Sequence, residues 1–245
     1  MSAVAIVPAR YASTRFPGKV LAPIAGVPML RRVVEGARQA KRVREVVVAT
    51  DDERVAEACR SFGAPVVLTA SSHPTGTDRL AEASRDLADE IVVNVQGDEP
   101  LIEGFVVDAA VAALEETPEA PMSTVVHRAE PAALADPNRV KVVLDRRGFA
   151  LYFSRAAVPH RRDGGADAPL WQHVGLYAYR REFLQRFVGL APTPLERAEA
   201  LEQLRALEYG HPIRVAVVEG WRSVPVDVPA DVARVEAILA GLARR

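Results

Sequence analysis

Short apolar runs without hydrophobic alternation constrain the fold of this chain more than any other feature. They lie at residues 4–7, 45–50 and 91–95. Strands buried on both faces of a parallel sheet have this pattern, whereas a strand with one wet face alternates apolar and polar residues. Helical patterns fill the intervals between the runs. We therefore expect an α/β fold, with a mostly parallel, twisted sheet flanked by helices.

The other expected elements continue this alternation. Further strands are predicted at residues 65–68, 123–127, 140–144 and 213–218, and helices at 28–41, 53–62, 78–87, 105–116, 182–187 and 195–207. A closing amphipathic helix follows residue 229, with Val232, Val235, Ile238, Leu239 and Leu242 on its apolar face. Residues 145–180 break the pattern with a long polar loop at 159–169. We expect one domain over 1–245, with 145–180 as an embellishment.

Length and charge exclude several classes of protein. The chain has 245 residues, 49% hydrophobic and 26% charged, with a formal net charge of −1. This length suits one large α/β domain with a substantial core. A general nucleic-acid binder would carry a basic surface. We expect no nucleic-acid partner, and any site for a polyanion has to be local.

The only cysteine and the N-terminal sequence indicate a cytoplasmic protein. Cys59 has no partner for an internal disulfide and suits a reducing compartment, as a small core residue on a helix. The first apolar run ends at Pro8 and charge arrives at Arg10, so no signal peptide is expected. No stretch approaches the roughly 20 apolar residues that span a bilayer. No membrane partner is expected.

A cationic loop follows the first predicted strand, at residues 8–19. Open α/β sheets bind ligands beyond the carboxyl ends of their strands. Cations interleaved with hydroxyls suit phosphate, through charge-assisted hydrogen bonds. The loop matches neither a dinucleotide fingerprint nor a Walker loop. Solvated surface charge is the alternative interpretation. The candidate residues are Arg10, Ser13, Thr14, Arg15 and Lys19.

Two aspartates are candidate metal ligands. Asp98 lies in a tight acidic turn after the strand at 91–95, and Asp227 precedes the closing helix. Hard oxygen ligands without nearby histidine or cysteine suit Mg²⁺, which takes one or two carboxylates and completes its shell with water and phosphate. A turn or helix cap is the alternative for each aspartate. The sequence does not show that the two meet in space.

Seven segments resemble one known family. They occur in the family's order and span nearly the whole chain, at residues 8–19, 49–51, 76–79, 94–100, 140–143, 150–155 and 201–205. Together they are similar to 3-deoxy-manno-octulosonate cytidylyltransferases, the CMP-Kdo synthetases. The sialate-activating relatives share the opening but not the combination of Gln-Gly-Asp-Glu-Pro, Tyr-Phe-Ser-Arg and Leu-Glu-Gln-Leu-Arg.

The resemblance implies a fold, a reaction and a cofactor. The fold would be the Rossmann-like nucleotide-diphosphosugar transferase type, in a homodimer with contacts from residues 145–180. The anomeric hydroxyl of Kdo would attack the α-phosphorus of CTP, giving CMP-Kdo and pyrophosphate for lipopolysaccharide synthesis. The reaction would depend on Mg²⁺.

The resemblance also implies roles for individual residues. Arg10, Lys19 and Asp98 would be catalytic, and Asp98 and Asp227 would hold the metal. CTP would bind to Ala9, Arg10, Ser13, Arg15, Lys19 and Gln96. The sugar would bind to Arg79, Gln96, Arg155, His173, Tyr177, Glu202 and Gln203.

Several alternatives stay open. His173 also fits a satisfied core histidine, and Glu202 and Gln203 fit an exposed helix face, where adjacent residues point about 100° apart. Asp78 stands where the family has glutamate, and Val228 where it has a hydroxyl residue. The other functions considered are a cytidylyltransferase for a related 2-keto sugar acid, such as 8-amino-Kdo or sialate, and a CTP-binding module without catalysis.

Overall fold

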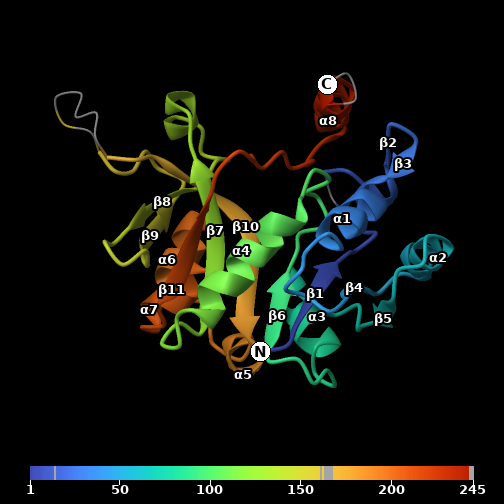
Figure 1. Ribbon diagram of the computed structural model, residues 1–245, viewed down its shortest axis with the longest axis horizontal. Helices are drawn as coiled ribbons and strands as arrows, with labels where there is room; N and C mark the ends of the chain where they lie inside the picture. The colour runs from blue at the N-terminus through green and yellow to red at the C-terminus, as the bar shows by residue number, and fades with distance from the viewer. Residues whose placement is uncertain (14, 161, 163–167, 243–245) are drawn as a thin grey trace. The chain divides into compact units, whose positions relative to one another are not determined.

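The computed structural model describes residues 1–13, 15–160, 162 and 168–242 (Figure 1). The chain divides into two compact units, Met1–Asp108 with Ser223–Arg245, and Ala109–Arg222. The prediction of a single domain over 1–245 is not tested by this division and stays a prediction. Among the described residues, no helix combines the length and apolar character needed to cross a membrane.

Parallel strands form the sheet of the first unit. β1 (Ala3–Pro8) lies between β6 (Ile91–Asn94) and β4 (Val46–Thr50), and β4 also pairs with β5 (Val66–Leu68). Ala5 faces Val46 on one neighbour and Val93 on the other. β4 and β6 are buried throughout, and β1 up to its last residue. The predicted buried, parallel strands are therefore confirmed, and their carboxyl ends share one edge.

Helices cover this sheet, with bounds that differ in part from those predicted. They are α1 (Met29–Ala37), α2 (Glu53–Ser61) and α3 (Gly76–Ala83). α4 (Gly104–Glu115) begins in the first unit, which ends at Asp108, and continues into the second. Between β1 and α1 lie a 3₁₀ turn, η1 (Lys19–Leu21), and a small hairpin, β2 (Pro23–Ile24) with β3 (Val27–Pro28). Cys59 on α2 is fully buried, as expected of a core residue.

The predicted helix at 78–87 was misplaced. α3 begins at Gly76 because the Thr75 hydroxyl accepts a hydrogen bond from the Asp78 N–H, while the Asp78 carboxylate accepts one from the Thr75 N–H. This reciprocal capping box satisfies two amide groups at the helix start. α3 ends at Ala83, four residues before the predicted end at 87. α1 likewise ends at Ala37, before the predicted end at 41.

The closing helix α8 (Pro229–Leu242) packs on the first unit through its predicted face. Val235 is buried against a cluster formed by Ile24, Met29, Val224 and Val226, and Val232, Ile238 and Leu239 pack beside it. Leu242 does not belong to this face, because it lies at the end of the helix and is 60% exposed. The packing fixes the residues that precede α8.

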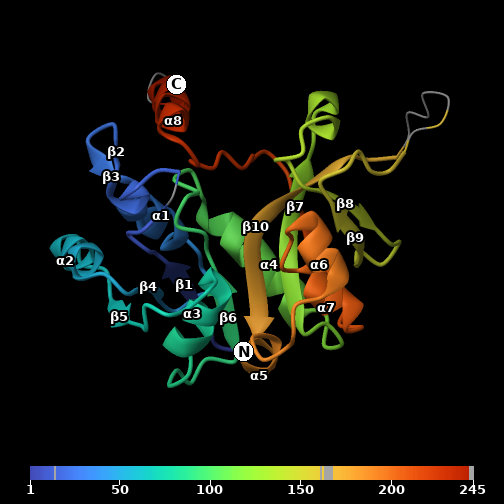
Figure 2. The same cartoon turned by 180° about the vertical axis from the view of Figure 1, so that it is seen from behind.

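The sheet of the second unit is mixed (Figure 2). β7 (Met122–Arg128) pairs in parallel with β11 (Ile213–Val218) and antiparallel with β10 (Trp171–Arg180). β8 (Lys141–Leu144) runs antiparallel to both β10 and β9 (Ala150–Ser154). A 3₁₀ turn, η2 (Pro131–Leu134), follows β7, and α5 (Arg181–Phe187) follows β10. The α/β fold with a mostly parallel sheet is confirmed, and the 159–169 loop lies partly outside the described residues.

The single helix predicted at 195–207 is wrong. The structure has α6 (Pro194–Glu199) and α7 (Leu204–Glu208), separated by Ala200 in the left-handed region, with φ 50° and ψ 50°. The Arg155 guanidinium donates to the carbonyl oxygens of Glu199 and Ala200, which helps to hold the break. Long-range contacts thus override a helical pattern. Glu202 and Gln203 lie in the connection between two helices.

Replacing Gly36 by alanine should destabilise the first unit. A Cβ at this position of α1 would lie 2.1 Å from the carbonyl oxygen of Ile102, so backbone would have to move. We expect a loss of at least about 2 kcal/mol in the free energy of unfolding, measured by denaturant titration. Gly241→Ala on α8 is the matched control, because nothing lies within 4 Å of its added Cβ. Equal effects of the two variants would contradict the close approach at Gly36.

Candidate functional site

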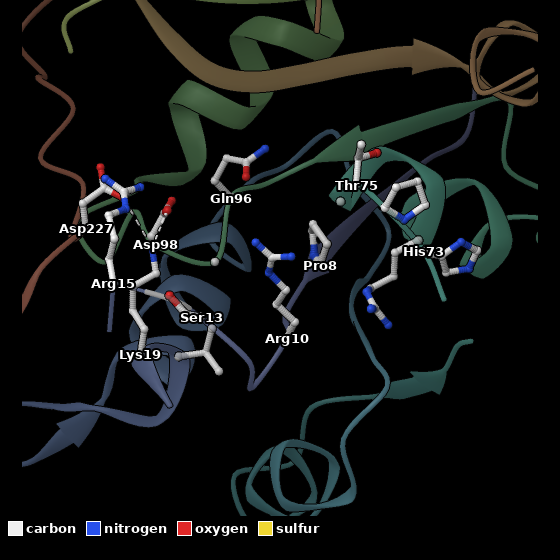
Figure 3. A pocket seen from close by; sticks show the side chains of 15 residues that line it. Pro8, Arg10, Ser13, Arg15, Lys19, His73, Thr75, Gln96, Asp98 and Asp227 are labelled. Atoms are coloured by element: carbon white, nitrogen blue, oxygen red, sulfur yellow. Dashed lines mark hydrogen bonds and ion pairs between the residues drawn. The ribbon is translucent and has the colours of Figure 1, made fainter. Parts of the chain in front are cut away.

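A pocket of about 330 Å³ lies in the first unit, beside the carboxyl ends of β1 and β6 (Figure 3). The opening loop, the start of α3, the turn after β6 and the segment before α8 supply its walls. The lining residues are Pro8, Arg10, Ser13, Arg15, Lys19, Val20, His73, Pro74, Thr75, Gly76, Arg79, Gln96, Gly97, Asp98 and Asp227.

The opening loop brings its predicted phosphate-binding side chains into this pocket. Arg10, Ser13, Arg15 and Lys19 all line it. Ala9 does not, because it is buried and its N–H donates to the carbonyl of Ala49, 2.8 Å away, as a continuation of β1. Thr14 lies outside the described residues. The cations of this loop are therefore more than scattered surface charge.

Lys19 joins the two predicted metal ligands. Its Nζ lies 2.8 Å from Oδ2 of Asp98 and 3.7 Å from Oδ1 of Asp227. Arg15 Nη2 contacts the same Oδ1 of Asp227 at 2.8 Å. Two carboxylates 129 positions apart in the chain thus share one ammonium group. The sequence did not show whether Asp98 and Asp227 lie close together, and their shared contact with Lys19 shows that they do.

Local hydrogen bonds present Asp227 to the pocket. The N–H of Val226 donates to the carbonyl of Asp98, 2.9 Å away. The N–H of Asp227 donates to Oδ2 of Asp231, at 2.8 Å, so Asp231 carries the capping contact at the start of α8. The carboxylate of Asp227 contacts Lys19 and Arg15 instead. The helix-cap alternative for Asp227 is therefore not what the structure shows.

The donor set of this pair fits a magnesium ion. Mg²⁺ is commonly held by one or two carboxylates, while water and substrate phosphates supply its other ligands. Asp98 and Asp227 are both partly exposed and converge on one cationic group. Across residues 1–13, 15–160, 162 and 168–242, no group of three or more His, Cys, Asp or Glu side chains forms an all-protein metal cage.

Glu99 was missed by the sequence interpretation, although it belongs to the Gln-Gly-Asp-Glu-Pro segment. Burial raises the pKa of its carboxyl to about 8, and the negative charges of Asp98 and Asp227 add to this. Its oxygens contact the Ser223 hydroxyl and the Val224 N–H. At neutral pH Glu99 is thus uncharged, and it holds the chain that leads to Asp227 without adding a third negative charge to the site.

The opposite wall contains Arg79, which the sequence predicted for the sugar, and His73, which the sequence interpretation overlooked. Arg79 lines the pocket of the first unit, where it pairs with Asp51 at 3.2 Å and contacts the Thr69 hydroxyl. His73 also lines the pocket, and its Nε2 contacts the Glu82 carboxylate. This hydrogen bond lowers the pKa of Glu82. The Thr-Gly-Thr-Asp capping box was the sequence signal for this wall.

Gln96, predicted for both CTP and the sugar, lines the pocket of the first unit. The other predicted sugar residues lie in the second unit. His173 and Tyr177 on β10 are in ring contact, with centroids 5.3 Å apart, and His173 also contacts the edge of Phe153. Nε2 of His173 lies 3.1 Å from the Thr124 hydroxyl. Burial lowers the pKa of His173 to about 3 and raises that of Tyr177 well above its ordinary value. Both side chains are therefore neutral around pH 7.

Arg155 and the turn between α6 and α7 form one network. The Arg155 guanidinium donates to the carbonyls of Pro137, Glu199 and Ala200, at 3.0, 2.7 and 3.3 Å. The Glu199 carboxylate accepts from the Arg155 N–H and the Ser154 hydroxyl, at 2.9 and 2.6 Å. Gln203 in the turn is buried, and its Nε2 has no hydrogen-bond partner within the part of the chain that the structure describes. The negative charge of neighbouring Glu202 raises the pKa of Tyr177, so the turn and β10 are close.

Comparison with known proteins identifies the family. The sequence model of the cytidylyltransferase family matches residues 4–214. A 3-deoxy-manno-octulosonate cytidylyltransferase of Syntrophotalea carbinolica is 53% identical over 251 residues, covering 99% of this chain and 100% of the relative. This chain belongs to the 3-deoxy-manno-octulosonate cytidylyltransferase family. The mitochondrial Arabidopsis thaliana member is 46% identical, covering 96% of this chain and 82% of its own.

Solved structures agree with this membership. A CMP:2-keto-3-deoxy-manno-octonic acid synthetase in complex with CTP superposes with a TM-score of 0.93 at 42% identity, over 98% of this chain and 99% of the other. A 4-diphosphocytidyl-2C-methyl-D-erythritol synthase from Anaerococcus prevotii has a TM-score of 0.65 at 11% identity, over 98% of both chains, and shows the fold alone. The predicted resemblance is confirmed, and this family member is a nucleotidyltransferase.

The half-buried, neutral His173 should make this cytidylyltransferase sensitive to acid. The unfolded chain takes up a proton near pH 6.5, whereas folded His173 does so only near pH 3. Between these values the unfolded state binds more protons, so this residue lowers the stability by up to about 1.4 kcal/mol per pH unit as the pH falls. Denaturant unfolding at several pH values should show a shallower dependence for His173→Gln. His160→Gln, at an exposed position, should keep the slope of the unaltered chain; a loss of slope there would contradict the assignment.

Proposed function

We propose that this chain transfers CMP from CTP to 3-deoxy-manno-octulosonate (Kdo), releasing pyrophosphate. The pocket of the first unit carries the proposal, because its cations surround a pair of carboxylates that converge on Lys19. Phosphoryl-type transfer relies on such positioning and charge stabilisation more than on covalent chemistry by the protein. The family and its CTP-complexed member support the choice of nucleotide and sugar.

The cationic loop would hold the triphosphate. Arg10 and Lys19 would offset the negative charge that develops on the pyrophosphate leaving group, with Ser13 and Arg15 as further donors. Buried Arg79, fixed by Asp51, would add a cation at the opposite wall. Because these groups already face the pocket, they need little reorganisation when the substrate enters.

Asp98 and Asp227 would hold the Mg²⁺ on which we propose the reaction depends. When bound there, the ion supplies charge neutralisation at the phosphate oxygens and lowers the pKa of the attacking hydroxyl. Lys19 and Arg15 together balance the two carboxylates in this structure, and Lys19 would be free to turn toward phosphate once the carboxylates have another cation. Uncharged Glu99 keeps the chain between Ser223 and Asp227 in place.

The second unit would supply the groups for the sugar. Three N–H groups of Arg155 are held by backbone carbonyls, which leaves the other two for the Kdo carboxylate. The unpartnered Nε2 of Gln203, protonated Tyr177 and neutral His173 are hydrogen-bonding groups suited to sugar hydroxyls. In the proposed reaction, the anomeric hydroxyl of Kdo attacks the α-phosphorus of CTP and pyrophosphate leaves.

A related 2-keto sugar acid, such as 8-amino-Kdo or sialate, is the second candidate acceptor. Asp78 is the reason for retaining this candidate. The family has a longer glutamate at this position, suited to a sugar contact, whereas the Asp78 carboxylate is engaged with Thr75 in the capping box of α3. A CTP-binding module without catalysis is disfavoured, because such a module has no need of paired carboxylates beside the triphosphate cations.

The cellular setting is part of the proposal. We place the enzyme in the cytoplasm, in lipopolysaccharide biosynthesis, and the buried free thiol of Cys59 is compatible with a reducing compartment. We also propose a homodimer with contacts from residues 145–180. Leu151 on β9, within this region, is 61% exposed and suits an interface.

Asp98→Asn should remove turnover. An amide keeps the shape of the side chain but loses the charge that would hold Mg²⁺, so we expect kcat to fall at least about 100-fold. Pyrophosphate release with CTP, Kdo and a Mg²⁺ titration measures the effect, and circular dichroism checks the fold. Asp86→Asn is the matched control, since Asp86 is exposed and outside the pocket. Near-normal rates for Asp98→Asn at low Mg²⁺ would remove Asp98 from the mechanism.

The acceptor is tested with a panel of 2-keto sugar acids. Pyrophosphate release from CTP should be fastest with Kdo and slower with 8-amino-Kdo and sialate, because two free N–H groups of Arg155 suit the carboxylate common to all and the remaining contacts select the sugar. If another acid gave pyrophosphate and Kdo gave none, the proposed acceptor would be wrong, while the proposed cytidylyl transfer would be supported.

A further inference from the structure

A cation–π contact connects the cationic loop to helix α2. The Arg54 guanidinium carbon lies 3.5 Å from the centroid of the Tyr11 ring. Tyr11 belongs to the loop that follows β1, and Arg54 to the first turn of α2, which follows the neighbouring strand β4. A guanidinium over an aromatic face is attracted by the ring quadrupole. The contact therefore connects two segments at the same edge of the sheet.

Asp52 fixes the guanidinium in this position. Its Oδ1 accepts from Arg54 Nε at 2.9 Å and its Oδ2 from Nη2 at 2.6 Å. Oδ1 also accepts from the backbone N–H of Arg54, at 3.0 Å, as the cap of α2. A two-point hydrogen bond restricts the planar group more than a single contact would. Arg54 is thus held in place although most of its side chain is exposed.

Tyr11 also contacts the other end of the loop, through its backbone carbonyl and its ring. The N–H of Gly18 donates to the Tyr11 carbonyl, 3.0 Å away, and brings the two ends of the segment together. Gly18 has φ 69°, and a Cβ there would lie 3.2 Å from Cζ of the Tyr11 ring. The ring therefore packs on backbone that only glycine fits well. Arg10 and Lys19 are the direct neighbours of these two residues.

We infer that Asp52, Arg54 and Tyr11 form a brace that positions the cationic loop for the nucleotide. Neither Tyr11 nor Arg54 lines the pocket, so they are positioning residues rather than catalytic ones. The brace holds the backbone at Tyr11 and Gly18, which are the direct neighbours of Arg10 and Lys19, and so positions these two cations for phosphate. Without it, the loop has to be ordered at the expense of binding free energy. The inference rests on the proposed binding of CTP in this pocket.

The brace is tested by measuring the Kd for CTP with the full chain, by calorimetric titration. Arg54→Gln and Tyr11→Leu should each raise the Kd for CTP about two- to fivefold, the range expected for an exposed cation–π contact. Tyr11→Phe keeps the ring and should bind CTP as the unaltered chain does. The KM for CTP should rise with the Kd, while the KM for Kdo stays unchanged.

A double-mutant cycle separates the contact from other effects. In the Tyr11→Leu background, Arg54→Gln should cause no further loss, because the contact is already gone. Arg60→Gln is the matched control, since Arg60 is an exposed cation on the same helix that pairs with Glu53 and has no contact with Tyr11. Arg60→Gln should leave the Kd unchanged, which excludes a general effect of lost positive charge.

Each outcome has a defined meaning. The proposed brace would be wrong if Arg54→Gln and Tyr11→Leu raised the Kd for CTP independently of each other. It would also be wrong if Arg60→Gln raised the Kd by the same factor. A Tyr11→Leu variant that binds CTP normally while its thermal stability is retained would likewise overturn it. If the unaltered chain itself bound no CTP, the proposed function would fail. If it bound CTP and all variants bound equally, only the brace would fail.

Discussion

The ammonium group of Lys19, shared by Asp98 and Asp227, is the interaction on which the site depends. It requires the loop after β1, the turn after β6 and the segment before α8 to converge within the length of one ion pair. Two negative charges at this separation repel each other unless a cation lies between them. The site is therefore organised by charge balance.

Much of this arrangement could be predicted from the sequence. Unalternating runs such as the one at residues 4–7 identified the buried strands, and parallel strands place their carboxyl ends together, which put Arg10 and Lys19 at a ligand-binding edge. The preference of Mg²⁺ for oxygen ligands made Asp98 and Asp227 candidates, and the family resemblance assigned both to one metal. The strands could be predicted because they depend on local pattern and on general rules of sheet topology, whereas the contact of both aspartates with Lys19 appears only in the structure.

The errors arose where contacts distant in sequence decide local structure. Residues 195–207 have a helical pattern, yet carbonyl groups held by Arg155 accompany a break at Ala200. Glu99 resembles an ordinary acidic turn residue, and only its burial shows that it is uncharged. A single sequence shows neither the burial of Glu99 nor the hydrogen bonds from Arg155 to backbone carbonyls, so both features could be found only in the structure.

The origin of Asp227 has a consequence for how the enzyme matures during translation. Strands β1, β4, β5 and β6 and the cationic loop are complete once residue 100 has been synthesised, so this part can begin to collapse early. The second carboxylate arrives only with residues 223–242, whose helix packs on Ile24 and Met29. A nascent chain still attached to the ribosome would thus present the cationic loop with Asp98 but without Asp227, so the ion-pair cluster around Lys19 is completed only when the last segment of the chain has folded.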